Sequence, residues 1–276
     1  MQSNGIKHMS PPPRLLHFHI FKNGGSTLDW ILKRNFGEQF REFHGPSSES
    51  TLFAPSIAKM LEENPGFSAF SSHHFRFPVE GIDNVVPLSF VRHPLDRVPS
   101  IYEQERRAQS DHLDDPVFES LSSWVAHALQ HRPMLLCDAQ VSFFGRGGIY
   151  YEVPSEDCLL DAKDVLDSLE FVGVVSQYEE SMALLEHVLR RWWPTFDASY
   201  FIQNASARER TLEERLARLA RLLEPEVYKA LVLNNRYDLN LFEYAQRIQA
   251  TRSSAIDDFS ERVADLRMRC QSLKEN

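Results

Sequence analysis

The segment KNGGST places a lysine, two glycines and two hydroxyl side chains within six consecutive residues. Its residues are Lys22, Asn23, Gly24, Gly25, Ser26 and Thr27. Backbone N–H groups of such a turn, at the start of a helix, form an anion site because they lack partners and the helix dipole is positive there. The glycines let an oxyanion approach the backbone closely, and the lysine and hydroxyl groups add donors. A surface turn before a capped helix explains the segment equally well.

The position of the lysine indicates which kind of anion the segment could bind. In the P-loop of nucleotide triphosphatases, G-x-x-x-x-G-K-[ST], the lysine follows the glycines. Lys22 precedes them. The segment therefore lacks the order of residues that binds a triphosphate together with magnesium.

A second candidate is the segment SFVRHPLDRVPSIYEQERR, residues 89–107. Arg92 ends a predicted strand, and Ser100 follows eight residues later, about two turns into the next predicted helix. If neighbouring parallel strands carry this segment and KNGGST, their carboxyl ends share one crevice, the usual ligand site of open α/β sheets. Each segment would then bind one phosphate. A salt-bridged arginine and an ordinary helix serine are the alternative.

The elements that must position these residues alternate along the chain. Strands are expected at residues 14–20, 66–75, 84–92 and 171–175, and helices after residue 26, after residue 93, over 114–131 and over 155–170. Ser26 or Thr27 is expected to cap the first helix. The chain is expected to be helical from residue 178 onward. This order predicts an α/β fold with a parallel sheet flanked by helices and a helical C-terminal half.

Composition and charge exclude several classes of protein. The chain has 276 residues, of which 42% are hydrophobic and 25% charged, as in ordinary globular proteins. The net charge of −9 argues against a nucleic-acid partner. We expect a disordered tail over residues 1–13, in which His8-Met9 resembles a cloning remnant, a single α/β domain over 14–250 and a C-terminal helix over 251–276.

The cysteines and the hydropathy indicate the compartment. Cys137, Cys158 and Cys270 are odd in number and form no C-x-x-C motif, so neither a disulfide framework nor a zinc site is expected. No apolar run reaches the roughly 18–20 residues of a membrane span. The polar start of the chain also lacks an apolar signal region. We expect a cytoplasmic protein without a transmembrane segment and without a metal.

The tail over 255–274 carries apolar residues at alternating spacings of three and four. These are Ile256, Phe259, Val263, Leu266, Cys270 and Leu273. Such a stripe is typical of a coiled-coil seam, although it covers fewer heptads than a coiled coil needs. It predicts a helix packed on its own domain, with a homodimer seam as the alternative.

Both phosphate segments resemble those of one family. FHIFKNGGSTLDWIL resembles the 5′-phosphosulfate segment H-I-P-K-T-G-G-T-S-L of sulfotransferases of the heparan 2-O-sulfotransferase-like group. SFVRHPLDRVPSIY resembles their 3′-phosphate segment F-x-x-R-[DH]-P-x-x-R-x-x-S-x-Y. Segments 136–145, with Gln140, 169–186 and 234–245 also resemble the family, so the likeness spans most of residues 14–247. Phe21 and Asn23 depart from it, because the family often has proline and threonine there.

The resemblance implies a P-loop-like fold and 3′-phosphoadenosine 5′-phosphosulfate (PAPS) as co-substrate. PAPS has no γ-phosphate and needs no magnesium ion, so a lysine ahead of the glycines suits it. Lys22 would contact the bridging oxygen and the 5′-phosphate and stabilise the charge on the leaving group. Residues 23–27 would cradle the phosphosulfate, and Arg92 and Ser100 would bind the 3′-phosphate.

The resemblance also implies a histidine base. A hydroxyl that attacks sulfur benefits from a positioned base, which raises the reaction rate about 10²–10⁴-fold. In the family this histidine occurs in strings such as G-H-F-x-[FY], which His74 and the following phenylalanine match better than His73 does. His73 is the second choice, and a solvated pair of loop histidines is the alternative. His17 and His19 alternate on the first strand and are expected to be packed or supporting groups.

The expected function is therefore transfer of a sulfuryl group from PAPS to a hydroxyl of a glycan, a glycolipid or a small metabolite. A carbohydrate acceptor follows from the resemblance alone, and the acidic chain disfavours a polyanionic polymer. Two other functions remain open. One is a small-molecule kinase that uses the same turn for ATP and magnesium. The other is a non-catalytic nucleotide-binding protein that dimerises through residues 255–274.

Overall fold

The computed structural model describes residues 12–45, 47, 50–108, 116–145, 153–201 and 211–275. In this part of the chain, five parallel strands form one sheet in the order β2-β3-β1-β4-β5. The strands are β1 (Arg14–Phe18), β2 (Phe40–Glu42), β3 (Ala69–Ser72), β4 (Val85–Val91) and β5 (Phe171–Val174). The strand that precedes the KNGGST segment is thus the central one.

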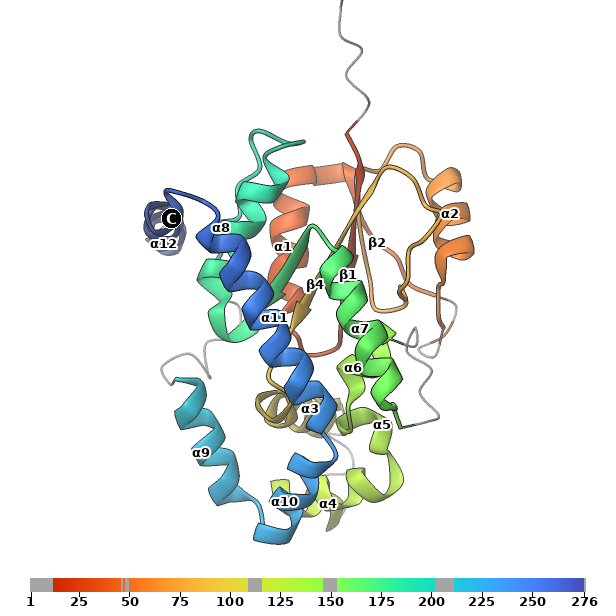
Figure 1. Cartoon of the computed structure of the whole chain (residues 1–276), viewed down its shortest axis with the longest axis vertical. Coiled ribbons are helices and arrows are strands. Elements are labelled where there is room, and N and C mark those ends of the chain that lie inside the picture. Colours follow the sequence, from red (N-terminus) through yellow and green to blue (C-terminus); the bar gives the residue numbers. More distant parts are fainter. Residues whose placement is uncertain are drawn as a thin grey trace, which may run out of the picture.

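Helices follow β1, β2, β4 and β5, and they make up most of the described C-terminal half (Figure 1). The α-helices are α1 (Gly25–Phe36), α2 (Ala54–Glu63), α3 (Pro94–Ala108), α4 (Leu121–His131), α5 (Pro133–Leu136), α6 (Ala139–Gly145), α7 (Glu156–Ser168), α8 (Tyr178–Leu189), α9 (Leu212–Leu222), α10 (Pro225–Leu233), α11 (Arg236–Ser254) and α12 (Phe259–Glu275). Short 3-10 helices are η1 (Gly37–Gln39), η3 (Pro116–Phe118) and η4 (Val175–Gln177).

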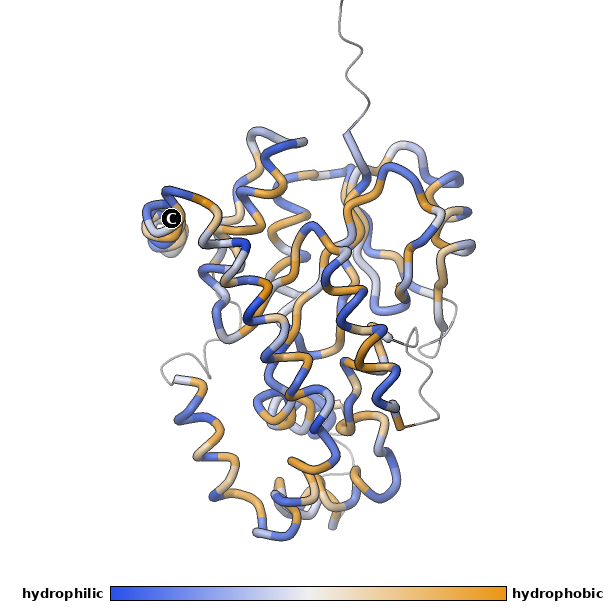
Figure 2. Tube along the Cα trace, in the orientation of Figure 1, coloured by the Kyte–Doolittle hydropathy of each residue, from blue (hydrophilic) through white to orange (hydrophobic). Residues whose placement is uncertain are grey.

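The two faces of the sheet bury separate cores. Successive residues of a strand point to opposite faces. Leu15 of β1 packs with residues of α1, α8 and α12, whereas Leu16 and Phe18 pack with α2, α6, α7 and α11. Figure 2 shows hydrophobic residues recurring between hydrophilic ones along these helices, as amphipathic helices on a core require.

A third core lies among α3, α4, α9 and α10. Figure 1 shows these helices at the end of the molecule opposite to the point where the chain enters β1. They therefore lie toward the carboxyl ends of the parallel strands. Ligand sites of open α/β sheets form at that edge.

The four predicted strands are confirmed with narrower bounds: β3 covers four of the ten residues expected, and the other three are one or two residues shorter than expected. The parallel α/β architecture is confirmed with them. Neither β2 nor α2 was predicted from the sequence. Strand β2 has only three residues, two of them exposed and charged, and so shows no apolar pattern. Among the described residues, no helix is both long and apolar enough to cross a membrane.

Two of the predictions concern the ends of the chain. The expected tail over residues 1–13 lies outside the described residues except for Pro12 and Pro13. The boundary expected at residue 251 falls inside α11, which continues to Ser254.

The apolar stripe of α12 packs on its own domain. Leu266 is buried, and Ile256, Phe259, Val263 and Cys270 lie against the same core. Helix α12 contacts α8 at the edge of the molecule (Figure 1). The side chains that a homodimer seam would use are therefore partly covered by this chain, and the seam remains a prediction.

Two aspartates cap the first turns of α6 and α11 reciprocally. Asp138 precedes α6, and its Oδ1 accepts the backbone N–H groups of Tyr237 (2.9 Å) and Asp238 (2.8 Å) in α11. Asp238 in turn accepts the backbone N–H groups of Gln140 (3.1 Å) and Val141 (2.7 Å) in α6. Both carboxylates are buried. The pair satisfies four N–H groups that helix starts otherwise leave unpaired.

This buried pair makes stability depend on pH. Burial and the nearby charge of Asp238 raise the pKa of Asp138 to about 7. The pKa of Asp238 is also raised, by burial. The unfolded chain holds these protons with a pKa of about 4. The folded chain binds them more tightly, so the free energy of unfolding falls as the pH rises from about 4 to about 7.

We expect Asp138→Asn to remove much of this fall, because asparagine keeps an acceptor oxygen for both N–H groups and carries no charge. The variant should be about 1–2 kcal/mol more stable than wild type at pH 8 and close to it at pH 4.5, measured by urea unfolding. Asp161→Asn, an exposed change on α7, is the control. A difference between Asp138→Asn and wild type that does not vary with pH would contradict the raised pKa.

Candidate functional site

The KNGGST turn opens α1 with unpaired backbone donors. Lys22 and Gly24 both have positive φ angles, of 63° and 78°. Gly24 is the N-cap of α1, which has neither a side-chain cap nor an acidic residue in its first turn. The expected cap by Ser26 or Thr27 is therefore wrong. The first N–H groups of the helix remain available to an anion.

The two glycines are required for different reasons. Gly24 adopts the left-handed conformation that side chains disfavour, and its carbonyl accepts a hydrogen bond from the Tyr178 hydroxyl at 3.2 Å. Gly25 leaves room for an imidazole, because a Cβ there would lie 2.1 Å from Cδ2 of His19. The glycine pair thus brings the His19 ring against the start of α1.

Asn23 connects the turn to β4 and α6. Its buried side chain donates to the carbonyl oxygen of Phe90 in β4 and to Oε1 of Gln140 in α6, both at 2.7 Å. Gln140 Nε2 also donates to Asp238 at 3.2 Å. The backbone N–H of Asn23 also donates, to the carbonyl oxygen of Ile20 at 3.1 Å. Asn23 therefore holds the turn in place, and the donors for an anion come from the residues that follow it.

Arg92 and the turn are in direct contact. One guanidinium nitrogen of Arg92 donates to the carbonyl oxygen of Lys22 at 2.9 Å, and Nε donates to Asp96 at 2.9 Å. The backbone N–H of Arg92 donates to Gln140 Oε1 at 2.9 Å. The structure therefore brings Lys22 and Arg92 together. Ser100 lies further along α3, and its hydroxyl has no hydrogen bond with any described residue.

The surroundings of Lys22 are cationic. Burial lowers the pKa of Lys22, and the charges of Arg92 and Arg107 lower it further. No acidic side chain in the described part of the chain forms an ion pair with Lys22. Asp96 pairs with Arg92 and also with Arg215 of α9 at 2.6 Å. This excess of positive charge favours an anionic ligand.

A cavity of about 320 Å³ opens on the other side of the turn. Its walls come from β1, β2, β3 and α1 and the residues that follow these strands. They are His19, Ser26, Asp29, Trp30, Lys33, Glu42, His44, Ser71, Ser72 and His73. The cavity is large enough for a sugar-sized ligand, and most of its lining side chains are polar or charged.

The structure brings His73, and not His74, to this cavity. His73 Nδ1 donates to the His19 carbonyl oxygen at 2.8 Å, which leaves Nε2 as the nitrogen without a hydrogen in the neutral ring. Partial burial and the neighbouring His19 lower the pKa of His73 to about 4. His74 is buried, and its Nδ1 donates to the carbonyl oxygen of Ser50 at 2.8 Å. A catalytic role for either histidine remains a prediction.

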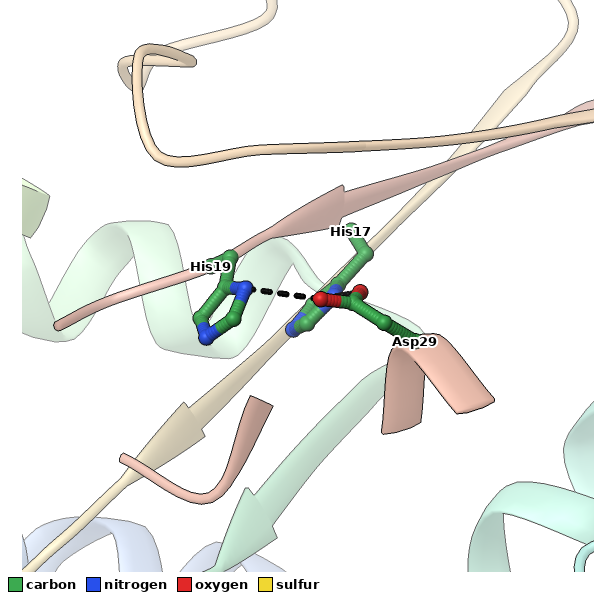
Figure 3. A group of neighbouring side chains, drawn as sticks. All are labelled: His17, His19 and Asp29. Carbon is green, nitrogen blue, oxygen red and sulfur yellow. Dashed lines mark hydrogen bonds and ion pairs between the residues drawn. The ribbon is translucent and has the colours of Figure 1, made fainter. Parts of the chain in front are cut away.

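The sequence analysis did not single out Asp29. Figure 3 shows its carboxylate between the rings of His17 and His19. Oδ1 lies 2.7 Å from His17 Nδ1, and Oδ2 lies 2.9 Å from His19 Nδ1. Burial alone would raise the pKa of Asp29, but the two imidazoles hold that pKa well below its usual range. The position of Asp29 one turn after Gly25 was the only signal in the sequence.

These features define an α/β protein with an all-parallel sheet and a cationic glycine turn at the end of its central strand. No family model matches the chain. A protein of Archaeoglobus fulgidus with the name "Uncharacterized protein" is 31% identical over 242 residues, which cover 83% of this chain and 94% of the archaeal one. The chain belongs to the same family as this archaeal protein.

The contact between Gly25 and His19 can be tested by adding one methyl group. We expect Gly25→Ala to lower the free energy of unfolding by about 1–3 kcal/mol, because the new Cβ overlaps the His19 ring. In a His19→Ala background the same change should cost much less, since the ring is gone.

Gly66→Ala is the matched control, because a Cβ there meets nothing within 4 Å. Its effect should stay within about 0.5 kcal/mol. Equal costs of Gly25→Ala in both backgrounds, measured by urea unfolding, would show that the His19 ring is not the cause.

Proposed function

We propose that the protein is a sulfotransferase of P-loop-like fold that moves a sulfuryl group from PAPS to a hydroxyl of a carbohydrate or small-molecule acceptor. The single observation that carries the proposal is the 2.9 Å hydrogen bond from the Arg92 guanidinium to the Lys22 carbonyl. It joins two phosphate-type segments that lie 70 residues apart in the sequence. The donor carries a 5′-phosphosulfate and a 3′-phosphate, so two segments that bind these groups must lie close to each other.

The turn suits the 5′-phosphosulfate end of the donor. The unpaired N–H groups of α1 and the hydroxyl groups of Ser26 and Thr27 would donate hydrogen bonds to its oxygens, and no carboxylate in the first turn repels them. Arg92, together with Ser100 of α3, would bind the 3′-phosphate. Lys22 would stabilise the charge that develops on the bridging oxygen as the sulfur–oxygen bond breaks.

The cavity beside the turn suits the acceptor. An acceptor hydroxyl there would attack sulfur in line, and His73 would take its proton through Nε2. We favour His73 over His74 because His73 lines the cavity and His74 does not. The mixed polar lining fits a sugar or another hydroxylated small molecule, and the net charge of −9 disfavours a polyanionic polymer.

A cytoplasmic location is part of the proposal. It rests on the three cysteines, which are all free thiols, as is usual in a reducing compartment.

The donor site can be tested before any acceptor is known. We expect 3′-phosphoadenosine 5′-phosphate to bind without metal and more tightly than ATP with Mg²⁺, measured by calorimetry. Lys22→Ala and Arg92→Ala should each weaken its binding about 10–100-fold, because each removes one charge-assisted interaction with a phosphate.

Lys59→Ala is the control for a general loss of positive charge, because Lys59 is exposed on α2 and pairs with Glu63. It should leave the affinity unchanged. Preference for ATP with Mg²⁺ would instead favour a kinase, and no nucleotide binding would overturn the donor site. Tight donor binding without transfer to any hydroxyl acceptor would indicate a non-catalytic nucleotide-binding protein.

The choice between the two histidines needs an acceptor from a screen of sugars and hydroxylated metabolites. With such an acceptor, His73→Asn should lower kcat about 10²–10⁴-fold and leave the affinity for 3′-phosphoadenosine 5′-phosphate unchanged. His74→Asn is the paired variant. If it alone lowers kcat at unchanged thermal stability, the base is His74, as the sequence pattern indicates.

A further inference from the structure

We propose that His17, His19 and Asp29 bind one divalent transition-metal ion such as Zn²⁺, Mn²⁺ or Fe²⁺. The site does not rest on the proposed sulfotransferase function. One nitrogen of each imidazole and one carboxylate oxygen all lie within 4.8 Å of one another. Figure 3 shows the three side chains converging from β1 and α1.

The ligand types select this class of ion. Two imidazole nitrogens and one carboxylate oxygen form the set that binds zinc, manganese and non-heme iron, whereas magnesium and calcium prefer oxygen alone. Ligand atoms that lie about 2.1 Å from an ion and at right angles around it are about 3 Å apart. Oδ1 of Asp29 lies 2.7 Å from His17 Nδ1, and Oδ2 lies 2.9 Å from His19 Nδ1. An ion bound by both imidazoles and the carboxylate would replace these two hydrogen bonds after a rearrangement of the three side chains.

The three side chains are held on rigid elements. His17 and His19 stand two residues apart on and just after the central strand, so both face α1. Asp29 lies in the second turn of that helix. Ser71 Oγ of β3 lies 2.9 Å from His17 Nδ1. This nitrogen therefore has two oxygen neighbours, although a ring nitrogen carries at most one hydrogen to share with them.

The cluster has a route to solvent. His17 is buried, but His19 and Asp29 line the 320 Å³ cavity beside the turn. An ion would therefore enter from the cavity and keep open coordination positions on that side. Water or a hydroxyl oxygen of a molecule in the cavity would fill those positions.

The first test is metal binding by the full chain without an affinity tag. We expect one Co²⁺ per chain, detected by its visible absorption, and competition by Zn²⁺. Asp29→Asn and His19→Gln should each weaken the affinity at least about tenfold, because each replaces a ligand. Zn²⁺ should raise the Tm of wild type and not that of either variant.

The control removes a close imidazole pair that lies outside the proposed site. His127 and His131 of α4 have ring centroids 4.6 Å apart and could bind a metal adventitiously. His127→Gln with His131→Gln should leave the Co²⁺ spectrum and affinity unchanged.

Two results would overturn the site. One is the absence of Co²⁺ binding by wild type at 100 µM metal, which is about ten times a Kd of about 10 µM and enough to fill such a site. The other is binding that survives in both Asp29→Asn and His19→Gln, or that disappears only with the α4 pair. Circular dichroism of each variant separates loss of the metal site from loss of the fold. If Asp29→Asn does not fold, metal binding by His19→Gln alone tests the site.

Discussion

The reciprocal capping of α6 and α11 by Asp238 and Asp138 is the interaction on which the site depends. It is buried, and it connects residues 100 apart in the sequence. Gln140, in the first turn of α6, extends it by hydrogen bonds to Arg92 and Asn23. The C-terminal half of the chain thus fixes the turn of the N-terminal half. A buried polar network of this kind is stable only when its members are satisfied together.

The cationic side of the turn is supported in the same way. Arg92 donates to the carbonyl oxygen of Lys22, and Arg97 donates to that of Phe21 at 3.0 Å. Asp96 accepts from Arg92 and from Arg215 of α9. Two arginines of one segment therefore hold the carbonyl oxygens of Phe21 and Lys22. The geometry of the proposed anion site depends on these contacts.

The histidine side of the turn follows from the alternation of β1. Leu16 and Phe18 belong to one core, whereas His17 and His19 face α1 on the other side. Polar side chains on a central strand are costly to bury unless they are paired. Asp29 provides the pairing, and the absence of a side chain at Gly25 provides the space. The turn therefore separates a cationic surface near Arg92 from an imidazole-lined cavity.

The sequence by itself determined four of the five strands and the parallel α/β class, because these depend on local periodicity. It also singled out Lys22 and Arg92, since short motifs carry them. Only the tertiary structure decided that His73 rather than His74 reaches the cavity, that Asn23 is an anchor and that Asp29 joins two histidines. Those assignments depend on which strands are neighbours and which way a side chain points, and contacts between residues far apart in the sequence decide both.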